Sequence, residues 1–590
     1  MIDDHPNFSP ALKPAAMRTK LILSLGVALA LTSSSSAQPA VASPLSGGGW
    51  ELAVAATPGG APAPVAGLGS ITFLDAVWTN ELESFTPRSD IPRTEEFQQG
   101  RRVRLPNGSR IYRVLTTTGT AMVRVDARSM VILGQVAGDG LTSGFAPGIG
   151  AASFAPYAAF TTLGASPRVY VVRTDTASPT LVDVTPVGGL SNLAHDSLAV
   201  VQDAVFFSAD ATLHRVDLNL LITQPIALPG APTWVDSEIA ISGDGTTIAL
   251  RAGSSGTACR LMTLDASGTN IAAYGTDGPV MELNYADPSQ RPAYSLSHDG
   301  LIAPYFKRTA TTIEFYMAEN YGLNLSPLLG TLDLQSVIGI ESEIALGDGT
   351  GSGRLVTFVP LPFFGNMLVS LPYPMLQFLL NLGGPGGFFG ALNGFSNFGL
   401  FGPGVSPVVT VDGHFRLDPF SSVFFILGPQ GSPRNLVQIA GSNVFGRTRL
   451  TGIEQVLDVA TLGADWLVVR AETTTVPGQG VAAFFVPISG GHAIDSSVLG
   501  PGDISGLAVA PGGHVIAAVH SNTPAGDTLW VIDGSAGVIT SMTTTGWCPG
   551  VQWSSSGAAL ASDVHGNVVS LAVGGVPVLL ATAAPGTFVL

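Results

Sequence analysis

The chain repeats one short pattern, and this repetition constrains its fold more than any other feature. Residues 239–252 read IAISGDGTTIALRA, which is an alternating apolar stretch, a glycine-rich turn and a second apolar stretch. Versions of it return as YSLSHDGLIAPYFK from Tyr294, LAVAPGGHVIAAVH from Leu507 and VQWSSSGAALASDV from Val551. Alternation with period two predicts strands, and a Gly in the turn supplies the positive φ that a tight hairpin needs. We therefore expect strand-to-strand turns at Gly245, Gly300, Gly513 and Gly557.

A further strand of each unit ends in an aspartate, which sets the repeat length. Similar apolar stretches end at Asp126, Asp175, Asp217, Asp265 and Asp533. A period of roughly 40–50 residues with four short strands is typical of a propeller blade, and stacked blades bury faces that one sheet leaves open. Nine candidate starts lie near residues 70, 150, 190, 233, 289, 340, 450, 504 and 549, and we expect at least one not to be a full blade. The prediction is an all-β chain with a single β-propeller of seven to eight four-stranded blades over residues 70–590.

The turns also resemble a known repeat. Ser242-Gly-Asp244-Gly245 and Ser297-His-Asp299-Gly300 are similar to the Ser-Pro-Asp-Gly turn of the TolB-like, or WD40-like, β-propeller repeat. The resemblance implies a disc with a central channel and a binding face. It implies no particular activity, because this fold serves enzymes and interaction modules alike.

The N-terminal 42 residues are typical of a signal peptide, with Met17 as an alternative start. Arg18 and Lys20 precede the apolar run Leu21–Leu31, which is too short to span a bilayer. Small residues permit cleavage after Ala37 or after Ala42. We therefore expect an exported protein, periplasmic or extracellular, in which residues 43–69 form a low-complexity linker.

The charge of the chain bears on its binding partners, and its two cysteines bear on disulfide formation. The net charge is −16, only 12% of residues are charged, and Lys307 is the one lysine beyond the first 20 residues. An acidic chain without a basic stripe is a poor ligand for the phosphate backbone, so we expect no nucleic-acid partner. Cys259 and Cys548 lie in distant units, and we expect two buried free thiols rather than a disulfide. A monomer is expected.

One segment interrupts the repeat. Residues 355–411 contain no charged residue, and their apolar runs are separated by Gly and Pro. Proline breaks the segment into pieces too short for a transmembrane helix. We expect an apolar Gly/Pro-rich insertion, either folded over a hydrophobic face or exposed as a lip that contacts a partner. The lip alternative predicts exposed aromatic rings at Phe363, Phe364, Phe388 and Phe389.

Chemistry-bearing residues are few, and no common catalytic or metal-binding motif occurs, so no metal site or cofactor is evident. In a propeller, functional groups converge at the channel mouth, near the start of the inner strands. The candidates there are Asp236, Glu238, Arg291, Asp503, His195 and Asp196. Their carboxylates could hold Ca²⁺ or act as acid and base, or they could only cap strand ends.

Two functions remain. The first is a non-catalytic exported propeller that binds a protein or a cell-envelope component. The alternative is a propeller hydrolase or lyase that uses the channel-mouth carboxylates, with Ca²⁺ as an optional ligand. The first is favoured because no His/Asp/Glu cluster recurs at the same position of successive repeats.

Overall fold

The structure is a computed structural model of the 590-residue chain. It divides into two units, Met1–Ser36 and Ala37–Leu590, and every element below belongs to the second. The structure describes residues 39–55, 61–78, 110–125, 130–151, 155–237, 239–242, 244–278, 280, 296, 300–308, 312–319, 328–333, 345–346, 354–361, 365–372, 407–408, 423–427, 434–439, 447–462, 466–473, 481–487, 494–495, 503–509, 515–521, 527–533, 538–544, 546–548, 551–553 and 557–590.

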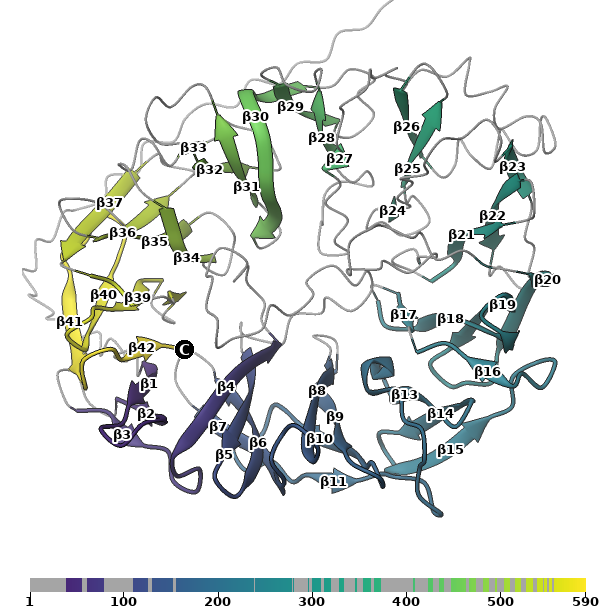
Figure 1. Ribbon diagram of the computed structural model, residues 1–590, viewed down its shortest axis with the longest axis horizontal. Coiled ribbons are helices and arrows are strands. Elements are labelled where there is room, and N and C mark those ends of the chain that lie inside the picture. The colour runs from purple at the N-terminus through teal and green to yellow at the C-terminus, as the bar shows by residue number, and fades with distance from the viewer. Residues whose placement is uncertain are drawn as a thin grey trace, which may run out of the picture. The chain divides into compact units, whose positions relative to one another are not determined.

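Almost all of the described residues with regular structure are in β-strands. The one helix among them is the short 3-10 helix η2 (His195–Ser197). The strands form nine antiparallel sheets, most of which join strands that follow one another in sequence (Figure 1). This confirms the predicted all-β class.

The first half of the chain supplies five sheets, the first of which also includes a strand from the C-terminal end. The strands are β1 (Ala40–Pro44), β2 (Trp50–Val54), β3 (Ala63–Pro64), β4 (Ile71–Trp78), β5 (Arg110–Thr116), β6 (Gly119–Val125) and β7 (Met130–Ala137) in one sheet; β8 (Gly144–Ala151), β9 (Tyr157–Leu163), β10 (Val169–Arg173) and β11 (Val182–Asp183); β12 (Ala199–Val200), β13 (Ala204–Ala209), β14 (Thr212–Asp217) and β15 (Ile222–Ile226); β16 (Trp234–Val235), β17 (Ala240–Ile241), β18 (Thr247–Ser255), β19 (Ala258–Asp265) and β20 (Ile271–Gly278); and β21 (Ile302–Arg308), β22 (Thr312–Glu319) and β23 (Leu328–Asp333).

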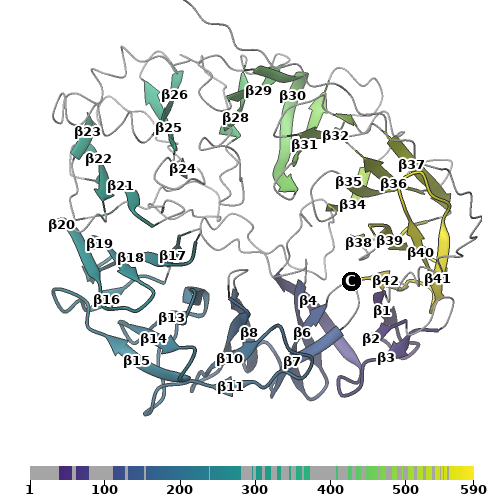
Figure 2. The ribbon, with the colours of Figure 1, turned by 180° about the vertical axis from the view of Figure 1, so that it is seen from behind.

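The second half continues in the same way, with β38 labelled in the reverse view (Figure 2). The strands are β24 (Ala345–Leu346), β25 (Arg354–Leu361) and β26 (Gly365–Pro372); β27 (Pro407–Val408), β28 (Val423–Leu427), β29 (Arg434–Ile439), β30 (Arg447–Leu462), β31 (Trp466–Thr473), β32 (Val481–Pro487) and β33 (Ile494–Asp495); β34 (Asp503–Val509), β35 (Val515–Ser521), β36 (Asp527–Asp533) and β37 (Val538–Thr544); β38 (Gln552–Trp553), β39 (Ala559–Ser562), β40 (Asn567–Leu571) and β41 (Val578–Thr582); and β42 (Phe588–Val589), which joins the first sheet.

The predicted turn glycines explain the hairpins. Gly245, Gly300 and Gly557 have φ of 71°, 68° and 77°, as a tight turn requires. Around Gly245, the Asp244 carboxylate accepts hydrogen bonds from the Thr246 amide and the Ser242 hydroxyl. Gly513 lies outside the described residues.

Consecutive sheets pack face to face through apolar side chains. Phe145 and Phe160 of the β8–β11 sheet share a core with Met122 of β6, and Phe207 of the β12–β15 sheet shares one with Val171 of β10. Further shared cores join the β12–β15 sheet to the β16–β20 sheet, that sheet to β21 and β22, and the β34–β37 sheet to the β38–β41 sheet. Each of these sheets therefore buries a face against the neighbouring sheet with which it shares a core.

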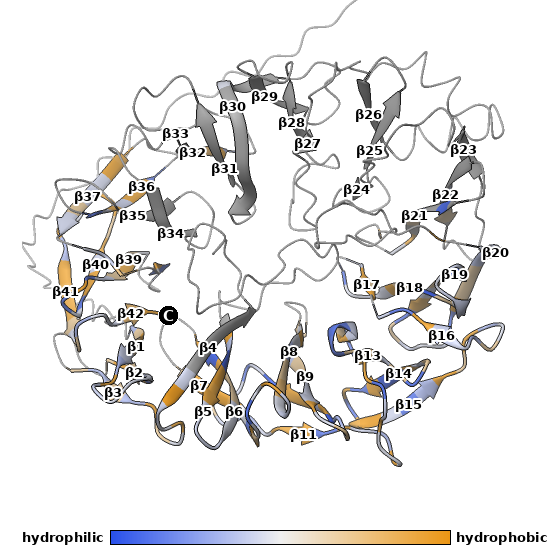
Figure 3. Cartoon of the chain, viewed as in Figure 1, coloured by the Kyte–Doolittle hydropathy of each residue, from blue (hydrophilic) through white to orange (hydrophobic). Residues whose placement is uncertain are grey.

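The two ends of the second unit are joined by strand pairing. Strand β42 pairs antiparallel with β1, placing Val41 opposite Val589 and Ala42 opposite Phe588. The Leu590 amide also donates to the Ala40 carbonyl over 3.0 Å. Strand β42 has the hydrophobic colour in Figure 3 and is buried. Sheets of consecutive antiparallel strands, packed in chain order and completed by a terminal strand, form a β-propeller.

Residues 43–69 differ from the expected linker, and residues 355–411 are described only in part. Residues 43–69, expected to be a linker, include the end of β1 and all of β2 and β3, which form the terminal sheet with β42. The turn between β1 and β2 contains Gly48 and Gly49, with φ of 87° and 83°, so it is a glycine turn like those of the repeat, and the sequence analysis missed it. In residues 355–411, β25 pairs with β26, and β27 pairs with β28, which follows the segment. The aromatic residues of the expected lip, Phe363, Phe364, Phe388 and Phe389, lie outside the described residues.

Candidate functional site

Two of the predicted site residues, His195 and Asp196, lie in helix η2, directly before β12. Ser197 fixes this helical turn, because its hydroxyl donates to the Ala194 carbonyl over 2.6 Å and accepts from the Ser208 amide over 2.8 Å. Apolar residues follow in β12 and enter the core, which leaves the preceding polar residues at the edge of the sheet. The Asp196 side chain is exposed and His195 is half-buried.

The imidazole of His195 is held by the neighbouring sheet. Its Nδ1 lies 2.9 Å from Oγ1 of Thr161, a fully buried residue of β9. No hydrogen bond joins Nε2 to any of the described residues. Burial lowers the pKa of His195, and the charge of Asp196 opposes that shift. The neutral ring can therefore present one nitrogen to a ligand.

A glycine in β8 makes room for this helical turn. A Cβ atom on Gly148 would lie 2.5 Å from the His195 carbonyl oxygen and 3.0 Å from Oδ1 of Asp196. Any side chain at this position would displace η2. The sequence APGIGA of β8 thus positions His195 and Asp196 by leaving space for them.

Asp236, a third predicted residue, belongs to a different setting. It follows β16, and its Oδ2 accepts a 2.5 Å hydrogen bond from Nε of Arg251 in β18. The Arg251 and Asp236 side chains are only 3% and 5% exposed. Arg251 also donates to the Val280 carbonyl over 3.2 Å and lies over the Trp234 ring, 5.7 Å from its centroid. Asp236 is therefore a partner within the fold and not a group at an open edge.

The other predicted residues are described in part or not at all. Asp503 is the first residue of β34, and its side chain is not described. Glu238 and Arg291 lie outside the described residues. His195 and Asp196 contact the β8–β11 sheet, whereas Asp236 is paired within the β16–β20 sheet. The structure thus places His195 and Asp196 side by side in η2, whereas Asp236 is paired with Arg251 in another sheet.

Sequence analysis missed Thr161 and Arg251, the residues that hold His195 and Asp236. Arg251 carried a usable signal, because a charged residue within the apolar stretch TIALRA must find a partner when the strand is buried. Lys307 carried the same signal in LIAPYFK: it is buried, and its Nζ donates to the Thr276 carbonyl. Thr161 carried none, because its partner is distant in sequence.

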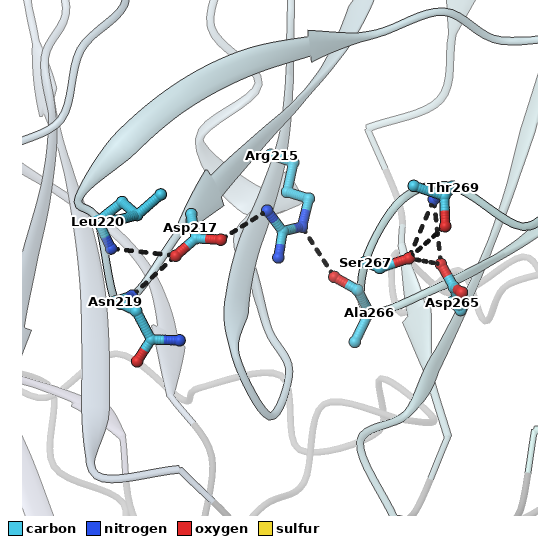
Figure 4. Close-up of polar contacts among 8 residues, drawn as sticks. All are labelled: Arg215, Asp217, Asn219, Leu220, Asp265, Ala266, Ser267 and Thr269. Carbon is cyan, nitrogen blue, oxygen red and sulfur yellow. Dashed lines mark hydrogen bonds and ion pairs between the residues drawn. The ribbon is translucent and has the colours of Figure 1, made fainter.

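Aspartates at the strand ends of the repeat stabilise turns. Asp217 accepts hydrogen bonds from the Asn219 and Leu220 amides over 2.9 and 3.0 Å, and Arg215 donates to it over 3.2 Å (Figure 4). Arg215 also donates to the Ala266 carbonyl of the next sheet over 2.8 Å. The repeated aspartate therefore has a structural role at this position.

The described part of the chain contains no group of three or more His, Cys, Asp or Glu side chains placed to hold a metal ion. Within those same ranges, no helix is long and apolar enough to cross a membrane. Cys259 and Cys548 are both buried and neither forms a disulfide, as predicted.

Comparisons with known proteins give only distant likenesses. No protein-family model matches the chain, and no curated protein matches its sequence. TolB from Acinetobacter baumannii matches at 14% identity and a TM-score of 0.22, covering 50% of this chain and 63% of that structure. Porphyromonas gingivalis dipeptidyl peptidase 4 matches at 10% identity and a TM-score of 0.41, covering 81% of this chain and 65% of that structure. A structure from an analysis of two prolyl endopeptidases matches at 9% identity and a TM-score of 0.33, covering 79% of this chain and 53% of that structure.

These likenesses include TolB, whose repeat the turn motifs resemble. Each TM-score is below 0.5, so the likeness alone assigns the chain to none of these families. The propeller fold rests on the strand order, the shared cores and the β1–β42 pairing described above.

Proposed function

We propose that this chain is an exported, non-catalytic β-propeller that binds a protein or a cell-envelope component at the surface formed by His195 and Asp196. The observation that carries the proposal is the geometry of His195. Its ring is fixed by Thr161 through Nδ1, and it lies beside an exposed carboxylate. A fixed donor or acceptor next to a charge is suited to recognising a polar group on a partner.

The environment of Asp236 supports binding over hydrolysis. General acid–base catalysis requires a side chain within hydrogen-bond reach of the substrate. Asp236 is buried and accepts a hydrogen bond from Arg251. Asp236 is one of the channel-mouth carboxylates that the hydrolase or lyase alternative would use, and the fold instead uses it to neutralise a buried guanidinium.

The N-terminal sequence, which is typical of a signal peptide, supports export. The basic residues, apolar run and small residues before position 42 form the three parts of a signal peptide. An exported propeller encounters proteins and envelope components as its available partners.

Site-specific photocrosslinking tests the proposed surface. A photoreactive amino acid would replace Asp196 in one variant and Leu220 in a control, since Leu220 is 68% exposed and lies next to β15 at the other edge of the same sheet. The proposal predicts a discrete adduct in producing cells from position 196 and none from position 220. It is wrong if position 196 gives no adduct, or if both positions give the same adducts.

A second variant separates recognition from local unfolding. Thr161→Val removes the hydroxyl that orients His195 while preserving the shape of a buried residue. We expect weaker adduct formation at position 196 with the turn-forming hydrogen bonds of Ser197 intact, as measured by hydrogen exchange of residues 193–200. Undiminished crosslinking would mean that the orientation of His195 does not contribute to binding.

A further inference from the structure

The junction between the β8–β11 and β12–β15 sheets contains two shielded histidines. His195 of η2 reaches β9 through Thr161. His214 lies on β14 directly opposite Phe207 of β13, and opposite residues of an antiparallel pair share one face of the sheet. Phe207 belongs to the core shared with the β8–β11 sheet, so His214 lies on the face that packs there.

His214 is placed where a positive charge is poorly tolerated. It is 9% exposed and stacks on Phe207 with ring centroids 5.0 Å apart and planes at 13°. Its Nδ1 is buried and has no hydrogen-bond partner among the described residues. Protonation would add an N–H at Nδ1 that no acceptor satisfies, and a buried unsatisfied donor costs free energy.

In the described part of the chain, the charges that compensate for protonation of these histidines are few. Asp210 is the charged group that favours protonation of His214, together with a hydrogen bond to the Ala209 backbone. The Asp210 carboxylate already accepts hydrogen bonds from the Ser191 and Asn192 amides over 3.1 and 2.9 Å. For His195 the corresponding charge is Asp196, which is exposed to water and therefore screened.

We propose that the junction between these two sheets is an acid-sensitive switch, in which protonation of His214 and His195 loosens the packing of η2 and β12–β14 against β8 and β9. The switch responds to mild acid, in the range where an unperturbed histidine becomes charged, below about pH 6.5. It does not depend on the proposed binding partner.

The linkage between protonation and folding gives the direction in which stability changes with pH. Burial is the main cause of a lowered pKa for both His214 and His195. A histidine whose pKa is lower in the folded state contributes stability that is complete above its unfolded pKa. That stability is lost as the pH falls from the unfolded pKa to the folded pKa, because the unfolded or opened state then binds more protons. This window lies above about pH 4, where an ordinary carboxyl group titrates.

Hydrogen exchange of the wild-type protein at pH 7.5 and pH 5.0, corrected for the intrinsic effect of pH, tests the proposal without any substitution. We expect the loss of protection to concentrate in residues 157–163, 193–200 and 204–217. Exchange there should accelerate by about tenfold for each unit by which burial lowers a histidine pKa, once the pH is below the folded value. Uniform loss across all sheets, or no loss at the junction, would overturn the proposal.

Two variants then assign the effect to the histidines. H214F retains a ring on Phe207 and H195N retains a hydrogen-bonding group toward Thr161, while neither titrates. The double variant should keep its protection at pH 5.0, and a control variant, H565N, should lose it like the wild type. If the double variant loses protection as the wild type does, other groups cause the acid sensitivity and the proposal is wrong.

Discussion

Arg251 and Asp236 form a nearly fully buried ion pair, with Nε 2.5 Å from Oδ2. The pair connects the strand β18 to the segment after β16 and so fixes the edge of the β16–β20 sheet. Asp236, which the sequence predicted at the channel mouth, is therefore a buried residue with a structural role.

Removing one member of this pair should destabilise the fold strongly. We expect D236A to lower the free energy of unfolding by about 3–5 kcal/mol, because it leaves the Arg251 guanidinium buried without its counter-charge. Denaturant unfolding would measure it. The double variant D236L/R251M should lose less than D236A, because it buries no charge.

The exposed pair formed by Arg173 and Asp175 provides the control. Their side chains are 52% and 42% exposed, so R173A should change stability little. If D236A is no more destabilising than R173A, the buried pair has no special structural role.

Two turn glycines with similar φ should differ in tolerance to alanine. Gly557 has open space where a Cβ would lie, whereas a Cβ on Gly300 would lie 2.3 Å from Oγ1 of the buried Thr247. We expect G557A to cost about 1 kcal/mol from its positive φ, and G300A to cost a further 1–3 kcal/mol from overpacking. Thermal or denaturant unfolding distinguishes the two, and equal costs would contradict the close packing of the Gly300 turn against Thr247.

Strong acid should weaken the aspartate turns. Burial raises the pKa of Asp265, but hydrogen bonds from Ser267, Asn270 and Thr269 outweigh it and leave the pKa below its usual value. A carboxylate with a lowered folded pKa contributes stability that is present above its unfolded pKa, near 4, and is lost as the pH falls through the folded value. The slope of unfolding free energy against pH below 4 should therefore be smaller in D265N than in wild type, and an unchanged slope would refute this role.

If the chain is exported, the structure selects one of the two cleavage positions. Ala40, Val41 and Ala42 are buried in β1, where they pair with β2. Cleavage after Ala42 would remove these residues from the sheet, so we expect cleavage after Ala37. N-terminal sequencing of the exported protein should begin at Gln38, and a start at Ser43 would contradict the role of β1.

The repeat could be predicted from sequence because its signals are local. Alternating residues and a turn glycine, as at Gly245, determine a hairpin within about fifteen residues. The terminal sheet could not be predicted, since Ala42 and Phe588 come together from opposite ends of the unit. The burial of Asp236 depends in the same way on the register that places Arg251 beside it. His195 and Asp196 were found as polar residues before an inner strand, whereas the role of Thr161 required the packing of two sheets.

The pairing of β42 with β1 is the relationship on which the closed propeller depends, and amide hydrogen exchange of the last residues measures it most directly. Residues at a chain end usually fray and exchange at once. Here the Leu590 amide donates to the Ala40 carbonyl, and Val589 is paired with Val41. We expect the Leu590 amide to be protected to an extent comparable with the amides of β39 and β40. Immediate exchange of Val589 and Leu590 in the folded protein would contradict closure by the C-terminal strand.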